Sequence, residues 1–455
     1  MSDNNTSPHR TFFKSICEDF RNNNRIDPEV FNNPNVRRGL RNRDGTGVLA
    51  GITQIGNVRG YSVVDDERSP IDGVLTYRGI NVEDIVESIT AENRFGFEEV
   101  VYLLLIGKLP TSSQLEEFKD MLSSYRELPR NFTEDMIIKA PSNNIMNKLA
   151  RSILALYSYD PNADDTSLEN MLRQSFSLIA QLPIIAAQAY QVKRHYYENK
   201  SMYLHIPPEH LSTAETLLYC TRSDRKYTEQ EAKLLDICLI LHAEHGGGNN
   251  SAFSCRVLSS TGTDTYSAIA AALCSLKGPL HGGANKQVVD MLKDIEKNVK
   301  HWDNDDEVRS YLKKILLGEA GDGSGKIYGM GHAVYTKSDP RAVILKKHAK
   351  ELAEKNPQFL KCFELIESVE RLTPEVFREV KGSDKPLCAN VDLYSGMVYQ
   401  MLGIPEDLYT PIFAVARVAG LCAHRIEEAM TGGRIIRPAY KCSSRDKKYI
   451  PISER

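Results

Sequence analysis

The stretch TPIFAVARVAGLCAHRIEEAM, residues 410–430, carries apolar side chains at the spacing of an α-helix. Apolar residues dominate it, so we expect a mostly buried helix. The same pattern recurs along most of the chain, at residues 81–89, 96–110, 112–122, 143–160, 175–198, 228–246, 265–278, 285–299, 305–318 and 340–355. The sequence therefore predicts a mainly α protein.

Strand signals are confined to the N-terminal part. Residues 48–56 and 73–80 are rich in β-branched side chains near turn residues, which predicts short strands. Residues 1–45 are polar and have little periodicity, so we expect an arm with one or two short helices. No fixed-period repeat and no alternation of strands with helices is found, which argues against a solenoid and a Rossmann-type sheet.

Composition excludes several classes of protein. The 455 residues include 57 basic and 60 acidic side chains, a net charge of -3, which argues against a general nucleic-acid binder. The apolar runs are too short to span a bilayer, and the polar N-terminus does not resemble a secretory signal. The nine cysteines form no C-x-x-C pair, and Cys238, Cys274 and Cys422 lie in apolar runs. We therefore expect no membrane contact, and buried free thiols in a reducing cytoplasm.

Glycine-dense segments interrupt the helical pattern between residues 246 and 331. One of them, KIYGMGHAVYTKSDPR (326–341), lacks the spacing of a phosphate loop or a dinucleotide fingerprint. HAEH places His242 and His245 three residues apart, a weak metal signal without the H-E-x-x-H pattern of zinc proteases. A metal-dependent hydrolase using this pair remains an alternative, and packing at a helix end is the simpler interpretation of His242.

The polar residues at these breaks are more informative as a set. His245, His281 and His332 each lie at a glycine-flanked break, and Asp392 lies at an expected helix start. Three arginines follow apolar or proline-marked segments: Arg341, Arg417 and Arg437. Such a set suits a small polyanionic substrate and proton transfer.

At these residues the sequence resembles the citrate synthase family, in its bacterial type. The motifs occur in family order: HAEHGGGNNSAF (242–253), GPLHGGAN (278–285), GMGHAVYTKSDPR (329–341), NVDLYSG (390–396), FAVARVAGLCAH (413–424) and RIIRP (434–438). The resemblance implies a two-domain helical homodimer that closes on its substrates. Residues 1–282 and 403–455 would form the large, dimerising domain, and residues 283–402 the small one.

The resemblance also implies a reaction: acetyl-CoA condenses with oxaloacetate and water to give citrate and CoA, a step of the tricarboxylic acid cycle, without a metal or other cofactor. Asp392 would be the base, His281 would polarise the thioester, and His332 would act at the oxaloacetate carbonyl. His281 precedes a helix expected to begin near Ala284, and a helix N-terminus favours a neutral imidazole.

The binding residues follow from the same resemblance. Those implied to hold the oxaloacetate carboxylates are His245, Arg341, Arg417 and Arg437, with Arg437 reaching into the partner subunit's site. Those implied to contact CoA are Gly329, Met330, Gly331 and Lys337. Two positions depart from the family, because Thr336 replaces a common basic residue and Leu393 a common aromatic one. The alternative activity is that of a 2-methylcitrate synthase, which uses propionyl-CoA and the same motif residues.

Overall fold

The computed structural model describes residues 8–64, 67–383 and 386–455. The chain forms two compact units, one of residues 51–436 and one that joins residues 1–50 to residues 437–455. The larger unit contains every expected site residue except Arg437. The expected division at residues 283 and 402 would lie within the larger unit, and it stays a prediction.

Helices make up most of the larger unit, which confirms the mainly α fold. They are α2 (Val82–Ala91), α3 (Phe97–Ile106), α4 (Ser112–Ser124), η3 (Thr133–Ile138), α5 (Ile145–Leu156), η4 (Tyr157–Tyr159), α6 (Leu168–Glu198), α7 (Thr213–Thr221), α8 (Glu229–His242), α9 (Asn250–Ser259), α10 (Thr265–Leu276), α11 (Ala284–Asn298), α12 (Asp305–Leu317), α13 (Pro340–Ala353), α14 (Pro357–Lys381), α15 (Val391–Met401), η5 (Glu406–Leu408) and α16 (Tyr409–Met430). Gly107 ends α3 with a φ of 89°, as its position in the sequence predicts.

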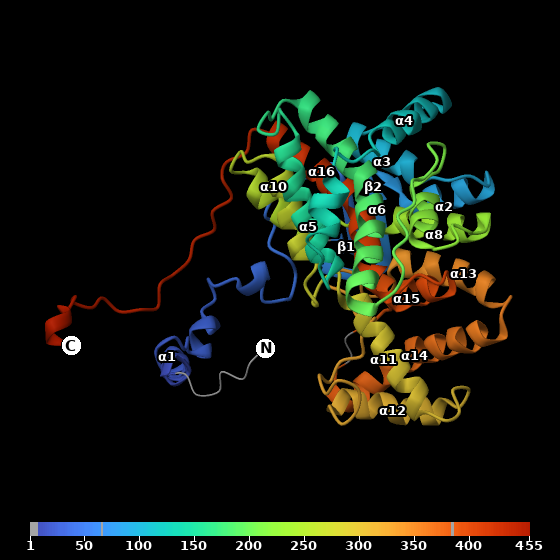
Figure 1. Ribbon diagram of the computed structural model, residues 1–455. Helices are drawn as coiled ribbons and strands as arrows, with labels where there is room; N and C mark the ends of the chain where they lie inside the picture. Colours follow the sequence, from blue (N-terminus) through green and yellow to red (C-terminus); the bar gives the residue numbers. More distant parts are fainter. Residues whose placement is uncertain (1–7, 65–66, 384–385) are drawn as a thin grey trace. The chain divides into compact units, whose positions relative to one another are not determined.

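The centre of the core is α16, the helix of the opening stretch. It packs against α3, α5, α6, α8, α9 and α10, and Figure 1 shows it in red among α5, α6 and α10. Most of its side chains between Tyr409 and Ile426 are buried. Polar groups on this helix therefore lie away from water and need partners within the protein.

Helices α11 to α15 gather at one end of the larger unit (Figure 1). They pack mainly on one another: α12 on α14, α13 on α14 and α15, and α11 on α15. Their contacts with the other elements include α8, α16 and strand β2, and two lysines of α11 pair with Glu406 of η5. The stretches that carry His332, Arg341 and Asp392 lie in this group, next to α8 and α16.

A three-stranded antiparallel sheet precedes the helices, in the order β1 (Gly56–Val64), β2 (Glu67–Tyr77), β3 (Ile80–Asn81). The register of β1 against β2 shifts between Arg59 and Tyr61, so Gly60 lies at an irregularity. Residues 73–77 are a strand as predicted. The strand predicted at 48–56 is wrong, because residues 48–55 are irregular and β1 begins only at Gly56.

Other expectations are also corrected. The helices α7, α9 and α14 lie outside the predicted segments, and α14 continues through Pro374. All nine cysteines are free, and Cys238 and Cys422 are buried as predicted. Cys274 is exposed instead, because it lies on the outward face of α10.

The smaller unit contains α1 (Pro8–Asn23), η1 (Pro28–Asn32), η2 (Arg38–Leu40) and η6 (Ile452–Glu454). Within residues 8–45, the predicted arm contains one α-helix of 16 residues and two short 3-10 helices, and residues 1–7 of that prediction lie outside the described residues. Over the described residues, no helix combines the length and apolar character needed to cross a membrane.

Candidate active site

An aromatic cluster joins two of the expected histidines. His245 follows the end of α8, and its ring lies 5.1 Å from that of His332 and 5.6 Å from that of Tyr335, edge to face in both cases. The rings of His332 and Tyr335 stack at 4.6 Å. The break after α8 and the loop before α13 therefore meet at one place.

Hydrogen bonds fix the tautomer of His332. The backbone N–H groups of Val334 and Tyr335 donate to its Nδ1, at 3.0 and 3.1 Å. A neutral imidazole that accepts at Nδ1 carries its proton on Nε2. The ring is thus prepared to donate a proton from Nε2.

His281 has the opposite tautomer. It lies in the turn before α11, which begins at Ala284 as predicted. Its Nε2 accepts the backbone N–H of Ser251 at 3.3 Å and lies 3.0 Å from Ser251 Oγ, so Nδ1 carries the proton. Burial, together with the charge of Arg417, lowers the pKa of His281 to about 4. The ring is therefore a neutral hydrogen-bond donor at neutral pH.

Asp392 lies in the first turn of α15, where Asn390 caps the helix by accepting the N–H of Asp392 at 3.0 Å. Burial raises the pKa of Asp392 to about 6, against the opposing effect of the cations Arg341 and Arg417. A carboxylate with such a pKa is ionised near neutral pH yet basic enough to take a proton.

The glycine loop that precedes His332 is bound to the stretch that precedes Asp392. The N–H of Gly331 donates to Cys388 O at 2.7 Å, and the N–H of Asn390 donates to Gly329 O at 2.9 Å. Both glycines have positive φ, 81° and 88°, and a Cβ on Gly329 would lie 2.9 Å from that of Leu393. Only glycine fits this approach, and the contact holds the stretches that carry His332 and Asp392 in register.

Arg341 is buried at the start of α13. Its Nε and Nη2 donate to the two carboxylate oxygens of Asp339, at 3.0 and 2.7 Å. Asp339 also caps α13 by accepting the backbone N–H of Arg341 at 3.0 Å. Burial opposes the charge, but Asp339 raises the pKa of Arg341 above its ordinary value. Asp339 thus orients a cation whose Nη1 makes no hydrogen bond within the part of the chain that the structure describes.

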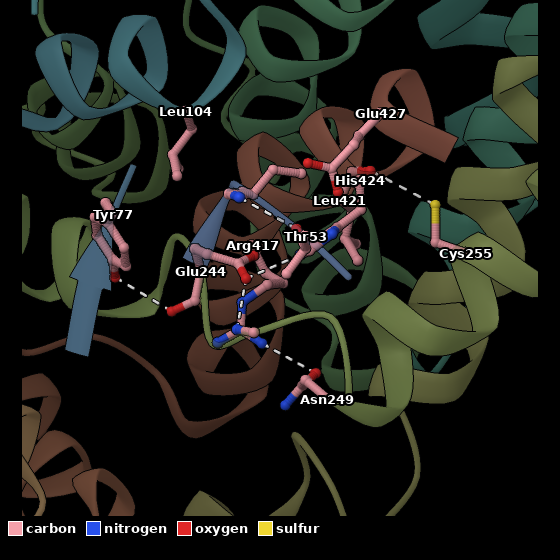
Figure 2. Close-up of polar contacts among 12 residues, drawn as sticks. Thr53, Tyr77, Leu104, Glu244, Asn249, Cys255, Arg417, Leu421, His424 and Glu427 are labelled. Carbon is pink, nitrogen blue, oxygen red and sulfur yellow. Dashed lines mark hydrogen bonds and ion pairs between the residues drawn. The ribbon is translucent and has the colours of Figure 1, made fainter. Parts of the chain in front are cut away.

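Arg417 is fully buried on α16 (Figure 2). Its Nε donates to His242 O at 2.7 Å, its Nη1 donates to Asn249 Oδ1 at 3.2 Å, and its guanidinium lies over the ring of Phe413 at 4.7 Å. Burial lowers its pKa to about 10, and Glu244 opposes this. The side chain therefore stays charged at neutral pH.

The charged and polar groups of the candidate site lie close enough to change one another's pKa values. Burial, followed by the charge of Arg341, the nearby ring of His332 and the charge of Arg417, lowers the pKa of His245 well below its ordinary range. Buried side-chain atoms without a hydrogen-bond partner within the described ranges also gather here: His242 Nδ1 and Nε2, His245 Nε2, Tyr335 Oη, Asp392 Oδ1 and Arg417 Nη2. Buried polar groups normally have partners, so this set indicates the place of a polar ligand.

Behind Arg417 lies a buried network that the sequence interpretation missed. Glu244 accepts from Gly246 N–H at 2.5 Å and from His424 Nε2 at 2.9 Å, and Arg256 donates to His424 Nδ1. Burial opposes ionisation of Glu244, but His424 and Arg417 hold its pKa below the ordinary value. Figure 2 shows Glu244 and His424 beside Arg417. Arg417 and His424 lie two turns apart on an otherwise apolar helix, and this pair of polar residues is the signal in the sequence that indicates the network.

Three of the residues expected to contact CoA are held by backbone contacts, and the fourth is exposed. Gly329 and Gly331 form the loop beside Asp392, and Met330 pairs with Ala389 in an isolated β-bridge. Lys337 is exposed. Of the departures from the family, Thr336 donates its hydroxyl to Gly60 O at 3.2 Å, and Leu393 is buried against Gly329.

Arg437 belongs to the smaller unit and is exposed. Its expected role in a partner subunit's site is therefore not tested by the contacts of the larger unit. His242, the other half of the alternative metal pair, packs against Phe413 at 4.5 Å. Within the described ranges, no group of three or more His, Cys, Asp or Glu side chains is arranged to hold a metal.

The fold is that of a mainly helical protein, and its candidate site gathers two buried arginines, neutral imidazoles and a carboxylate of raised pKa. Residues 45–439 match the family described as "Citrate synthase, C-terminal domain". A citrate synthase from Acidithiobacillus ferridurans is 35% identical over 429 residues, 93% of this chain and 99% of that protein. The 2-methylcitrate synthase 1 of Corynebacterium glutamicum is 33% identical over 430 residues, 92% of this chain and 98% of that protein.

A solved structure leads to the same family. The citrate synthase of Thermoplasma acidophilum, in a ternary complex with carboxymethyl coenzyme A and oxaloacetate, aligns with a TM-score of 0.76 and 28% identity. The alignment covers 93% of this chain and 100% of that one. The chain belongs to the citrate synthase family and is an enzyme of that kind.

Proposed function

We propose that the enzyme condenses acetyl-CoA with oxaloacetate and water to give citrate and CoA, in the tricarboxylic acid cycle. The observation that carries the proposal is the convergence of a raised-pKa carboxylate, neutral histidines of opposite tautomers and two buried arginines. This set matches the needs of a reaction that takes a proton from a weak carbon acid and neutralises a new alkoxide.

The first step is enolisation. Asp392 takes a proton from the methyl group of the thioester, while the Nδ1–H of His281 donates to the thioester oxygen as negative charge develops there. A neutral imidazole suits this role, because it donates a hydrogen bond without first losing its own proton. The low pKa of His281, about 4, supports the assignment.

The second step is carbon–carbon bond formation. The enolate carbon attacks the keto carbon of oxaloacetate, and the Nε2 proton of His332 passes to the carbonyl oxygen as it becomes a hydroxyl. The proton that Asp392 took restores His332 before the next turnover. His245, Arg341 and Arg417 hold the carboxylates of oxaloacetate, and Arg437 of the other subunit completes the set in a homodimer. Water then hydrolyses the citryl thioester and releases CoA.

CoA is held by the loop of Gly329, Met330 and Gly331 and by Lys337. The division into a large and a small domain at residues 283 and 402 lets the site close over both substrates and exclude water. We place the enzyme in the cytoplasm and assign it no metal or other cofactor.

The direct test is CoA release from acetyl-CoA and oxaloacetate by the purified enzyme, with propionyl-CoA run in parallel. We expect acetyl-CoA to give the higher kcat/KM. A higher value with propionyl-CoA would establish the second candidate, a 2-methylcitrate synthase, which the Corynebacterium glutamicum relative favours. One methylene is worth about 10–200-fold in such a comparison, so the assay separates the two.

Two further measurements test the residues. Arg417→Ala should weaken oxaloacetate binding by about 2–5 kcal/mol, because the substrate carboxylate loses a buried cation. Unchanged affinity would remove Arg417 from the site. Treatment with EDTA should leave activity intact, whereas a hydrolase built on His242 and His245 would lose it.

A further inference from the structure

Tyr335 has no part in the reaction described above, yet it lies among the reacting groups. Its side chain is 2% exposed, and its hydroxyl has no hydrogen-bond partner in the part of the chain that the structure describes. Leaving a hydroxyl buried and unpartnered costs free energy. A ligand at this place would supply the partner.

The ring of Tyr335 holds the imidazole of His332. The two rings stack with centroids 4.6 Å apart and an interplanar angle of 27°. The backbone N–H of Tyr335 also donates to Nδ1 of His332 at 3.1 Å. One residue thus constrains both the plane of the imidazole and the nitrogen that carries its proton.

The β1–β2 hairpin supports Tyr335 at two glycines. A Cβ on Gly73 would lie 2.7 Å from Cδ1 of Tyr335 and 2.2 Å from the carbonyl oxygen of Ser338. A Cβ on Gly60 would lie 2.9 Å from Cα of Tyr335 and 2.4 Å from the carbonyl oxygen of Val334. The hairpin therefore packs against this loop as closely as backbones allow, and Tyr335 has little room to turn away.

The surroundings of the hydroxyl point to an anionic partner. Burial raises the pKa of Tyr335, while the charge of Arg341 acts in the opposite direction and is the largest charge effect on it. Arg341 has two of its nitrogens on Asp339, and its Nη1 remains for a ligand. A hydroxyl in the field of this guanidinium can donate to the same bound carboxylate.

We propose that Tyr335 is a positioning residue for His332, and that its hydroxyl donates a hydrogen bond to the oxaloacetate carboxylate held by Arg341. The inference rests on the proposed function and extends it. The ring aims Nε2–H of His332 at the keto oxygen, and the hydroxyl adds a donor to the carboxylate.

Two variants separate the ring from the hydroxyl. Tyr335→Phe removes the hydroxyl alone, and Tyr335→Leu removes the ring as well. The control is Tyr266→Phe, because Tyr266 is also buried but its hydroxyl already has a partner, Asp160, to which it donates at 2.8 Å. The readouts are the Kd of oxaloacetate by calorimetry without acetyl-CoA, kcat and KM, thermal unfolding, and the ¹⁵N signals of the His332 ring.

The Phe variant should raise the Kd of oxaloacetate about 10-fold or more, the usual effect of a lost hydrogen bond to a charged group, with kcat within about threefold of the wild type. The Leu variant should raise the Kd as well, and it should also lower kcat about 10-fold or more and weaken the Nε2–H signal of His332. The Phe variant keeps the ring, so its His332 signal should be that of the wild type. The control should change neither Kd nor kcat.

A Phe variant with wild-type Kd would overturn the role of the hydroxyl. If the Leu variant had the same kcat and the same His332 signals as the Phe variant, the role of the ring would be overturned. Tyr335→Met provides the same readout if the Leu variant does not fold. Failure of the proposed function itself is distinct, because the wild type would then neither bind oxaloacetate nor release CoA. In that case the proposed role of the hydroxyl is rejected as well. The ¹⁵N signals of His332 in the Leu and Phe variants still test the role of the ring.

Discussion

Asp392 meets two opposing demands, because burial disfavours its charge and the proposed reaction requires that charge. Burial raises its pKa from 3.8 to about 6, although Arg341 and Arg417 both act in the opposite direction. Since the folded state binds this proton more tightly than the unfolded state does, the resulting stabilisation is present below about pH 4 and is lost as the pH rises through 6. At neutral pH the buried charge of Asp392, the proposed base, therefore lowers the free energy of unfolding.

Asp392→Asn should lower kcat about 100-fold or more, because the variant has no base. It should also raise the free energy of unfolding at pH 8 by about 1–3 kcal/mol, because no buried charge remains. The measurement is urea unfolding at pH 8 and pH 4, with exposed Asp303→Asn as the control. At pH 4 the gain should vanish, and an equal gain at both pH values would contradict the assignment.

The second residue-level prediction concerns His281. With its pKa lowered to about 4 and Nε2 accepting from Ser251, the ring should be neutral at pH 7 with its proton on Nδ1. ¹⁵N NMR of the enzyme with oxaloacetate and a non-reactive CoA thioester analogue reads both properties, and exposed His210 provides a solvent-exposed reference. An imidazolium signal from His281 at pH 7 in this complex would reject its proposed role.

Sequence reasoning named the candidate reactive side chains but not the residues that hold them. Arg417 and His281 stand out because their motifs are rich in glycine or apolar residues. Glu244 and His424 escape notice because they are 180 positions apart and meet only in the folded protein. Asp339 is part of the Asp-Pro-Arg motif, but its hydrogen bonds with the Arg341 side chain depend on geometry that a motif does not contain.

At the scale of elements, α16 carries two functions on one face. Arg417 lies in the candidate site, and two to three turns later His424, Glu427 and Glu428 bind Arg256 from α9. Gly420 lies between them, and a Cβ there would lie 2.4 Å from Glu244 Oε2. The helix therefore links the site to a buried ion-pair network through a position that admits no side chain.

Arg256→Met should lower the free energy of unfolding by about 3–5 kcal/mol, because it leaves Glu427 and Glu428 without their buried cation. The control is Lys119→Met, which removes an exposed pair with Glu116 and should cost less than about 1 kcal/mol. Urea unfolding of both variants at one pH provides the comparison. Equal losses in the two variants would show that the network does not stabilise α16.

The elements also show where sequence patterns stop being informative. Helices with a clear apolar face were predicted, and α11 begins at the expected residue, Ala284. The strand predicted at residues 48–56 failed because β-branched residues favour a strand only where a partner strand exists. Here β2 pairs with residues 56–64 instead, and the two glycines that fit this hairpin to the His332 loop have meaning only in the folded protein.

At the scale of the whole molecule, the larger unit brings together most of the site from a single chain. His245, His281, His332, Arg341, Asp392 and Arg417 all belong to residues 51–436. Arg437 begins the C-terminal segment of the other unit. The proposed homodimer gives this exposed cation a place, because a third carboxylate-binding arginine would come from the neighbouring subunit.

Subunit mixing tests that arrangement. Asp392→Asn and Arg437→Ala should each abolish most activity when present in both subunits. In a mixed dimer, the subunit that keeps Asp392 receives Arg437 from its neighbour, so one complete site re-forms. Co-expression with two affinity tags isolates the mixed dimer, which should show about half the wild-type activity, because a two-fold symmetric dimer has two equivalent sites.

The two possible placements of Arg437 give different results in this experiment. If Arg437 acted within its own subunit, every site in the mixed dimer would lack either Asp392 or Arg437, and activity would stay at the level of the single variants. A mixed dimer of Asp392→Asn with His332→Ala is the control: both residues lie in the larger unit, so neither subunit offers a complete set and no activity should return. Recovery only in the first mixture therefore assigns Arg437 to the neighbouring subunit's site.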